Sequence, residues 1–294
     1  MNTPHPIPAT LTARDGTVLA LRHWPLPDGV TPRGVACLVH GLGEYIERYA
    51  HVAAQLNQWG WAVVGHDHRG HGHSQGPHGV LQQEDDLLVD LAQVLDTIRH
   101  AYPDQRLLMI GHSLGGLVAS RFVAALAQPP EAAAWSRPID ALVLSSPALA
   151  FDMSAVQKVL IHTVGRLTPK LPVSNGLNAD WVCSDPAVVK AYANDPMIHD
   201  RITPRLTRFL LHSGTVVQQR AATWATPTLL IYAGADRCVN PAGSARFSAN
   251  APTSQVTTHR YAHMAHELFN EPDQSLVFAD LGRWLDMLDT PPQA

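Results

Sequence analysis

A serine between two glycines is the feature of this chain with the clearest chemistry. The segment Gly111-His112-Ser113-Leu114-Gly115 follows the apolar run 107–110 and precedes residues with the composition of a helix. A turn this sharp admits only small residues two positions before and after the serine, and it leaves the hydroxyl pointing free. The pattern predicts that Ser113 is a nucleophile, and a serine that merely closes a strand is the alternative.

A serine hydroxyl needs a base to take its proton, and the base needs a third group to orient it. In proteins with this kind of turn, the acid and the histidine follow the serine along the chain. Asp236 comes directly after the apolar run 229–232 and is the candidate acid, with a turn or helix N-cap as its alternative role. His263 and His266, which follow the last expected strand, are the candidate bases.

Acyl chemistry also needs two fixed backbone donors for the oxyanion. One is the amide of the residue after the nucleophile, Leu114. The other should come from the loop after an early strand, and His40-Gly41-Leu42-Gly43-Glu44 follows the apolar run 35–39. The glycines let this backbone bend toward the serine, so the Leu42 amide is the second candidate and a simple turn is the alternative.

Four histidines suggest a competing chemistry, a metal site. They are His66, His68, His71 and His73. Their spacing differs from the metallo-hydrolase pattern H-x-H-x-D-H, because Gly70 stands where a carboxylate should and Arg69 puts a cation among the ligands. We therefore expect no metal and no other cofactor. Asp67 and Arg69 are expected to be structural, and His112 is expected to pack rather than to catalyse.

The elements that position these residues follow from short apolar runs separated by helix-like segments. This alternation predicts an α/β fold with a mostly parallel central sheet flanked by helices on both faces. The expected strands are 11–13, 18–23, 35–39, 61–64, 107–110, 141–144, 228–232 and 256–261. Asp15-Gly16 predicts a hairpin between the first two strands. Apolar residues at helical spacing from Leu87 to Ile98, preceded by acidic residues, predict a helix.

One interval, from Ala150 to Ala222, breaks this alternation. No core strand is expected there, but an apolar stripe at helical spacing ends at Thr168-Pro169. The stripe comprises Met153, Val156, Val159, Leu160, Val164 and Leu167. A helical insertion after the sixth strand indicates a cap. We predict a core domain formed by residues 1–149 and 223–294, and a cap formed by residues 150–222.

Bulk composition excludes several classes of protein. The 294 residues carry a net charge of -4 and are 46% hydrophobic, so no basic surface for nucleic acid is expected. The N-terminus has neither a basic start nor an apolar core, and no apolar run reaches the roughly 18 residues of a membrane span. We expect a soluble, cytoplasmic protein. Its cysteines, Cys37, Cys183 and Cys238, have the spacing of neither a disulfide framework nor a zinc site.

Longer motifs extend over almost the whole chain. They are HGLGEYIERY at 40–49, DHRGHGHSQG at 67–76, GHSLGG at 111–116, SDPAVVKAYANDP at 184–196, AGADRCV at 233–239 and HELFNEP at 266–272. In these motifs the chain resembles the monoacylglycerol lipase and lysophospholipase branch of the α/β-hydrolases, also called the serine aminopeptidase S33 group. The combination is highly specific.

The resemblance implies an α/β-hydrolase fold and a complete catalytic set. It implies nucleophile Ser113, acid Asp236, base His266, and oxyanion donors Leu42 and Leu114. It therefore selects His266 over His263. In relatives that cleave monoacylglycerols, the corresponding Glu, Arg and Tyr line a polar alcohol pocket, which implies Glu44, Arg48 and Tyr192 here. Two other roles stay open: Glu44 could brace the oxyanion loop, and Arg48 could pair with a carboxylate.

Together these features predict a serine hydrolase of carboxylic esters, with a monoacylglycerol as the preferred substrate class. The apolar cap, including Val159 and Leu160, is expected to bind the acyl chain. Lysophospholipase or medium-chain carboxylesterase activity is the next alternative, followed by aminopeptidase activity and by ligand binding on an inactive hydrolase fold. The expected partner is a lipid or ester substrate, with a transient contact between the cap and a membrane surface as a further possibility. Acyl chain length, positional preference and oligomeric state stay open.

Overall fold

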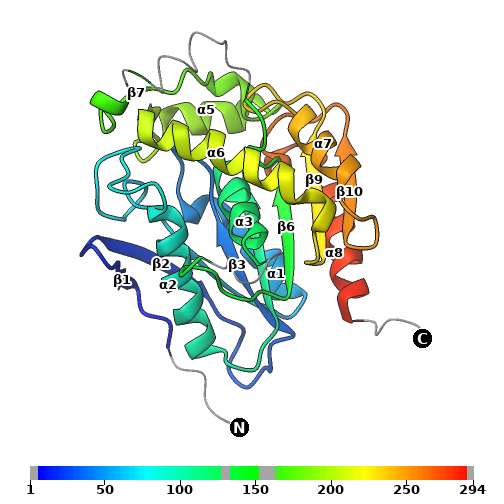
Figure 1. Cartoon of the computed structure of the whole chain (residues 1–294). Coiled ribbons are helices and arrows are strands. Elements are labelled where there is room, and N and C mark those ends of the chain that lie inside the picture. The colour runs from blue at the N-terminus through cyan, green and yellow to red at the C-terminus, as the bar shows by residue number, and fades with distance from the viewer. Residues whose placement is uncertain (1–5, 127–132, 152–162, 164, 290–294) are drawn as a thin grey trace.

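The computed structural model describes residues 6–126, 133–151, 163 and 165–289. Eight strands form one sheet in the order β1-β2-β4-β3-β5-β6-β9-β10 (Figure 1). They are β1 (Thr10–Thr12), β2 (Val18–Trp24), β3 (Gly34–Val39), β4 (Trp61–His66), β5 (Leu107–His112), β6 (Ala141–Ser145), β9 (Thr228–Ala233) and β10 (Val256–Tyr261). Each expected strand is present, with its ends shifted by two residues at most.

Most of this sheet is parallel. Strands β4, β3, β5, β6, β9 and β10 pair in parallel, whereas β2 pairs antiparallel with both β1 and β4. The hairpin is confirmed, with Thr12 opposite Val18 and Gly16 at φ +89° in the turn. Because parallel strands end at the same edge, the loops after β3, β5, β9 and β10 meet there. Those loops carry the candidate site residues.

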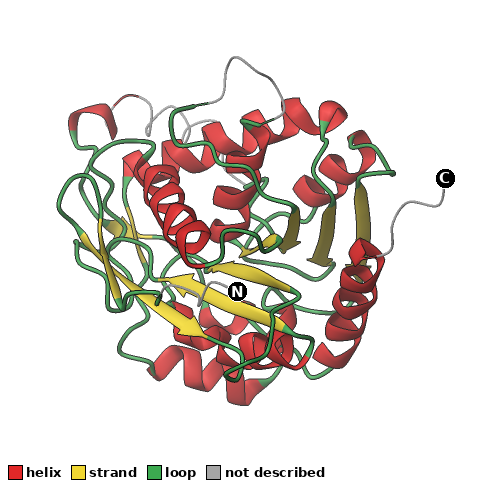
Figure 2. Ribbon diagram, turned by 90° about the horizontal axis from the view of Figure 1, so that it is seen from below, coloured by secondary structure: helices red, strands yellow, loops and turns green. Residues whose placement is uncertain are grey.

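Helices cover both faces of the sheet, as the view from below shows (Figure 2). The described helices are α1 (Ala50–Gln58), α2 (Asp86–Ala101), α3 (Leu114–Ala124), α6 (Pro204–Arg220), α7 (Ala242–Asn250) and α8 (Gln274–Asp289), together with α5 (Pro186–Asn194) in the segment between β6 and β9. The expected helix 87–98 lies inside α2, and its apolar stripe is buried. An α/β fold with a mostly parallel sheet flanked by helices is therefore confirmed.

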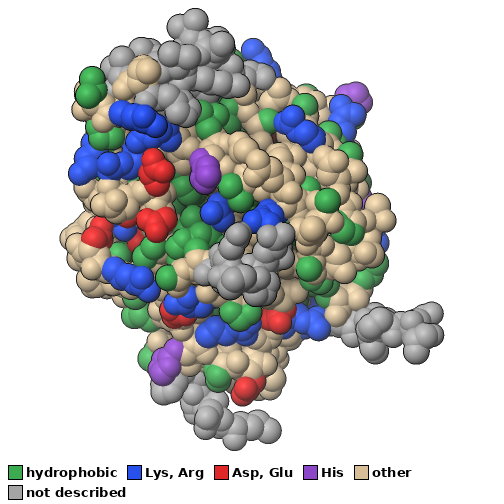
Figure 3. All heavy atoms as spheres, viewed as in Figure 1, with side chains coloured by type: hydrophobic (Ala, Val, Ile, Leu, Met, Phe, Trp, Pro, Cys, Tyr) green, Lys and Arg blue, Asp and Glu red, His purple; other side chains and the backbone are tan. Residues whose placement is uncertain are grey.

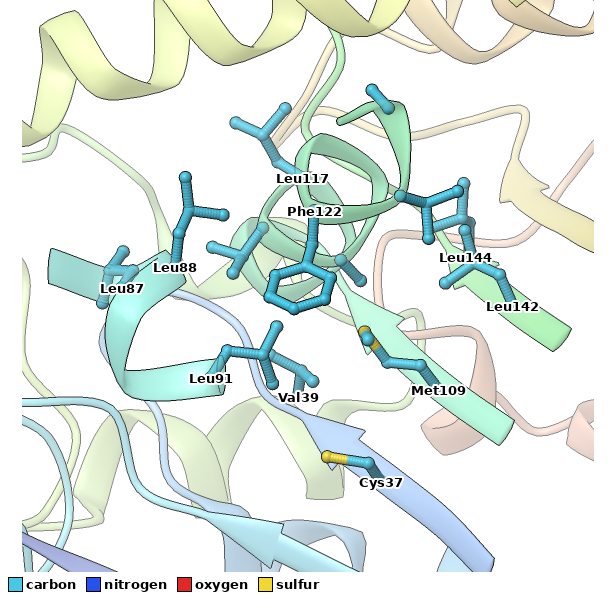
Figure 4. Close-up of a cluster of buried hydrophobic side chains, with 14 of the residues drawn as sticks. Cys37, Val39, Leu87, Leu88, Leu91, Met109, Leu117, Phe122, Leu142 and Leu144 are labelled. Atoms are coloured by element: carbon cyan, nitrogen blue, oxygen red, sulfur yellow. The ribbon is translucent and has the colours of Figure 1, made fainter. Parts of the chain in front are cut away.

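Five inner strands, β3, β4, β5, β6 and β9, are buried on both faces, which explains why they read as nearly continuous apolar runs. Alternate residues of β3 enter two different cores: Val35 and Cys37 pack with α2 and α3, whereas Ala36 and Leu38 pack with α1 and α8. Phe122 of α3 lies at the centre of the first core, between leucines of α2 and side chains of β5 and β6 (Figure 4). This packing fixes α3, and with it the turn that precedes α3.

A different architecture separates β6 from β9. It contains a short ribbon of β7 (Val173–Ser174) and β8 (Arg201–Ile202), followed by α6 after a Thr203 N-cap. No part of this segment joins the central sheet within the described residues. The predicted stripe falls mostly outside the described residues, as do Val159 and Leu160. Leu167, its last member, is 85% exposed.

Basic and acidic side chains are spread over the face of the molecule seen in Figure 3, rather than gathered by sign. This distribution provides no continuous basic surface on that face. Among the helices of the described residues, none has the length and apolar character that a membrane span requires.

Candidate active site

Ser113 lies on a sharp turn between β5 and α3. Its backbone adopts φ 53° and ψ -116°, a region that non-glycine residues rarely occupy. The flanking glycines permit the close approach: a Cβ on Gly111 would stand 2.5 Å from the carbonyl oxygen of Gly115, and a Cβ on Gly115 would stand 2.1 Å from that of Val39. The serine is partly exposed, although both of its neighbours are buried. The turn has the geometry of a nucleophile elbow.

Asp236 and His266 meet at the carboxyl edge of the sheet. Asp236 follows β9, His266 follows β10, and Nδ1 of the histidine lies 2.7 Å from Oδ2 of the aspartate. The other carboxylate oxygen, Oδ1, accepts hydrogen bonds from the amides of Cys238 at 2.8 Å and Val239 at 3.0 Å. The alternative base, His263, is exposed. Of the two candidate histidines, His266 is thus the one bound to the candidate acid.

The surroundings of His266 favour its charged form. Burial alone would lower the pKa of this imidazole, whereas the charge and hydrogen bond of Asp236 raise it. The charges of Glu267 and Glu44 act in the same direction, so the pKa is raised. The centroids of the His112 and His266 rings are 4.7 Å apart. Burial, together with the charge of His266, lowers the pKa of His112 to about 3. His112 therefore stays neutral.

The loop after β3 lies against the serine. A Cβ on Gly41 would stand 3.2 Å from the Cβ of Ser113. The amides of Leu42 and Leu114 donate no hydrogen bond to any group in the described part of the chain. Both predicted oxyanion donors are therefore available, one at the start of α3 and one in this loop.

Glu44, Arg48 and Tyr192, which the resemblance assigns to an alcohol pocket, lie next to one another. The Arg48 guanidinium donates to Oε2 of Glu44, and its Cζ lies 4.9 Å from the centre of the Tyr192 ring. Oε1 of Glu44 accepts hydrogen bonds from the Gly41 amide at 2.6 Å and from the Tyr49 hydroxyl at 2.7 Å. Both oxygens of this buried carboxylate are thus occupied by protein groups.

Glu267 is a site residue that the sequence did not single out. Its two oxygens accept hydrogen bonds from Nη1 and Nη2 of Arg48 at 2.7 and 2.8 Å. Its side chain is 6% exposed. The only signal in the sequence is its position directly after His266 in the HELFNEP motif.

The two structural assignments in the second motif are supported by contacts. Asp67 accepts hydrogen bonds from the amides of Ile46 at 2.7 Å and His73 at 2.8 Å. Arg69 forms a bidentate pair with Asp90, with both distances at 2.7 Å. Asp67 thus ties its loop to the segment that contains Ile46, and Arg69 ties the same loop to α2.

Five histidines lie close together next to the oxyanion loop, and we call them the histidine cluster; four are buried and His199 is partly exposed. Burial lowers their pKa values, to about 4 for His66 and His199 and well below the usual value for His40, His68 and His71. Their rings contact one another, with centroids 4.3 Å apart for His40 and His68 and 4.5 Å apart for His71 and His199. The cluster is therefore neutral at pH 7.

The arrangement of possible metal-ligand atoms can be compared with the run of histidines at 66–73. Among the described residues, Asp236, Cys238 and His266 are the one group of three whose ligand atoms converge, within 4.8 Å of one another. The run of histidines at 66–73 forms no such group in that part of the chain. Burial, together with Asp236, raises the pKa of the Cys238 thiol, so this cysteine is not a competing nucleophile.

A cavity of about 480 Å³ lies in the segment between β6 and β9. It is lined by residues from 175–182 and 192–201 and by His78. Tyr192, whose ring covers Arg48, is one of these residues. Tyr192 therefore links the cavity to Arg48, although Arg48 and its two carboxylate partners do not line it.

Comparisons with known sequences agree with this geometry. Residues 30–273 match the family described as serine aminopeptidase, S33. The monoacylglycerol lipase of Mycolicibacterium smegmatis is 36% identical over 257 residues, which cover 86% of this chain and 88% of the relative. The human monoglyceride lipase is 27% identical over 290 residues, which cover 96% of this chain and 93% of the relative.

Solved structures show the same architecture. The crystal structure of the Paleococcus ferrophilus monoacylglycerol lipase matches with a TM-score of 0.79 at 30% identity, covering 92% of this chain and 99% of that chain. A soluble variant of the Saccharomyces cerevisiae monoglyceride lipase, in complex with a substrate analog, shares the fold with a TM-score of 0.83 at 22% identity. It covers 99% of this chain and 97% of that chain. By its match over residues 30–273 and its likeness to these relatives, the chain belongs to the serine aminopeptidase S33 family of α/β-hydrolases.

Proposed function

We propose that this protein is a monoacylglycerol lipase that cleaves carboxylic esters through a serine nucleophile. The observation that carries the proposal is the 2.7 Å bond between His266 and Asp236 at the edge of the sheet where Ser113 stands on its elbow. Relatives named monoacylglycerol or monoglyceride lipase, which match this chain over most of its length, support the substrate class.

In the proposed reaction, Oγ of Ser113 attacks the ester carbon while Nε2 of His266 accepts the hydroxyl proton. Asp236 holds the Nδ1 proton and stabilises the imidazolium. The oxyanion receives hydrogen bonds from the amides of Leu42 and Leu114. His266 then protonates the departing alcohol, and the acyl group stays on the serine. Water, deprotonated by His266, releases the fatty acid and restores the serine.

We further propose that residues 150–222 form a cap over a core of residues 1–149 and 223–294, with Val159 and Leu160 in the acyl site. The absence of a central-sheet strand from the described part of this segment supports the division. Tyr192 is proposed to line the alcohol side of the pocket, because it borders both Arg48 and the cavity. Transient membrane contact through the cap and a cytoplasmic location are the remaining predictions.

The aminopeptidase alternative needs a carboxylate that grips the free amine of a peptide. Glu44 is poorly suited to this role, because its two oxygens already accept three hydrogen bonds from protein groups. This occupancy favours esters without charged amines. Lysophospholipids and medium-chain esters remain the nearest alternative substrates.

A substrate panel with purified protein tests the proposal. Monoacylglycerols, diacylglycerols, lysophospholipids, p-nitrophenyl esters and aminoacyl anilides are compared by kcat/KM. We expect the highest value for a monoacylglycerol, and labelling by a fluorophosphonate that is lost in Ser113→Ala. A higher value for an aminoacyl anilide, or undiminished labelling of the variant, would reject the assignment. Dialysis against EDTA is expected to leave activity unchanged.

A further inference from the structure

One buried cation joins the two loops of the proposed site that lie farthest apart in the sequence. We call Arg48, Glu44, Glu267, Tyr49 and Asn270 the Arg48 cluster. The side chains of Arg48, Glu44 and Glu267 are 13%, 4% and 6% exposed. Two carboxylates and one guanidinium thus share a volume with little access to water. In such surroundings every unpaired charge is costly, so the pairing is strongly favoured.

On one side, the cluster holds the oxyanion loop. Oε1 of Glu44 accepts from the Gly41 amide at 2.6 Å, and Gly41 lies against Ser113 and directly precedes Leu42. The Tyr49 hydroxyl donates to the same oxygen at 2.7 Å. The position of the Leu42 amide therefore depends on where the Glu44 carboxylate is held.

On the other side, the cluster holds the loop of the base. Arg48 donates to both oxygens of Glu267, at 2.7 and 2.8 Å, and Asn270 donates to Oε2 of Glu267 at 2.7 Å. The Glu267 amide donates to the carbonyl of Val182 at 2.7 Å. Glu267 directly follows His266, so fixing this side chain fixes the backbone that carries the imidazole. A planar guanidinium matches this bidentate geometry, whereas an ammonium does not.

From these contacts we propose that Arg48 is a positioning residue, which ties the oxyanion loop to the loop of His266 through Glu44 and Glu267, rather than a contact for the substrate's alcohol. The inference rests on the proposed function. Four donors already occupy Glu44 and Glu267: the Gly41 amide, the Tyr49 hydroxyl, the Asn270 amide group and Arg48 itself. The carboxylates of Glu44 and Glu267 thus accept hydrogen bonds from protein donors rather than from a glycerol hydroxyl. The excess negative charge of the cluster also supports the raised pKa of His266.

A positioning role and an alcohol-binding role for Arg48 can be distinguished by comparing esters of one fatty acid with different alcohols. Arg48→Lys keeps the charge but loses the planar fork that binds both oxygens of Glu267 while also reaching Glu44. We expect it to lower kcat by about 10- to 100-fold for the glyceryl ester and for the methyl ester alike, with KM changed by about twofold or less, because small misplacements of catalytic groups have effects of this size. Arg69→Lys, at a bidentate arginine that is 5% exposed and lies away from the site, is the control and should retain the wild-type kcat.

Glu267→Gln gives a second, independent readout. It removes a charge that raises the pKa of His266, so the rising limb of kcat/KM against pH should move to lower pH, an effect that a purely structural residue would not produce. An unmoved limb would overturn the proposal. So would an Arg48→Lys variant that loses only affinity for the glyceryl ester, or one that lowers Tm at unchanged kcat. Loss of the proposed function itself would be recognised differently, by a Ser113→Ala variant that still hydrolyses the methyl ester.

Discussion

Two buried arginines in this protein have similar partners and, by our inference, different tasks. Arg69 forms a bidentate pair with Asp90 of α2 and also reaches Asp86 of α2 at 3.0 Å and Asp15 of the β1–β2 turn at 2.8 Å. Arg48 forms a bidentate pair with Glu267 and also donates to Glu44. In both cases burial alone would lower the pKa of the guanidinium, and neighbouring carboxylates raise it instead.

The location of the partners makes the difference. The partners of Arg69 belong to a helix and a turn of the scaffold, so their loss should affect stability. The partners of Arg48 belong to the loops that carry the proposed oxyanion donor and the proposed base, so their displacement should affect turnover. The same type of ion pair should therefore affect stability or turnover, depending on which elements it joins.

The largest effect should come from the catalytic side of this comparison. Ser113→Ala is expected to lower kcat by about 10⁴-fold or more, because members of a catalytic triad act as a unit. His266→Ala should match it, and His263→Ala should retain activity. Steady-state kinetics on a short-chain ester measure all three. A damaging His263→Ala beside an active His266→Ala would show that the exposed histidine is the base.

The next largest effect should come from the scaffold side. Arg69→Met leaves buried carboxylates without their cation, so unfolding free energy should fall by about 3–5 kcal/mol. Urea unfolding measures the loss, and kcat of the remaining folded enzyme should stay near the wild-type value. A large fall in kcat at normal stability would erase the distinction between the two arginines.

Acid should destabilise the protein through a group that neither arginine controls, the histidine cluster. Its rings have lowered pKa values, so the unfolded chain binds more protons below its own pKa of about 6.5. Stability should be fully present above pH 6.5 and fall by about 1 kcal/mol per histidine for each pH unit toward pH 4. His66→Leu should reduce this slope, because it removes one buried group whose pKa is lowered. Leucine should be tolerated there, because neither ring nitrogen of His66 has a hydrogen-bond partner within the described residues. Urea midpoints between pH 4 and 7 provide the measurement, and an unchanged slope would reject the role of His66.

The smallest effect is expected at the rim of the Arg69 group. The Asp15 side chain is 36% exposed, so water screens its pairing with Arg69. Asp15→Asn should therefore lower unfolding free energy by less than about 1 kcal/mol, with Asp90→Asn as the buried comparison. Thermal unfolding of the two variants ranks them. Equal losses would mean that exposure does not separate these ion pairs.

Local patterns predicted the scaffold well, because each signal lies within one element. The strand at 107–110 and the glycines around Ser113 predicted both β5 and the elbow, and both are present. The strands β4 and β5 extend two residues beyond their apolar runs, to His66 and His112. The apolar pattern did not predict these two histidines as strand residues, because their side chains are polar. Their rings are buried because loops cover this edge of the sheet.

The candidate site divides in the same way. Ser113 and Asp236 are recognisable from their positions after apolar runs, whereas the preference for His266 over His263 needed the resemblance to a family. The bond between His266 and Asp236 then distinguishes the two histidines by geometry. The cap stripe stays a prediction, because most of it lies outside the described residues; its last member, Leu167, is exposed rather than packed.

The sequence by itself thus determined which strands and helices follow one another along the chain, the elbow, and the residue types that the chemistry needs. Hydrophobic periodicity and turn composition are local properties, so they can be read without the fold. Only the tertiary structure decided which charges meet. Arg48 and Glu267 are 219 residues apart in the chain, and no spacing rule connects them. Their contact arises because parallel strands deliver both loops to one edge of the sheet, where burial makes each charge depend on the other.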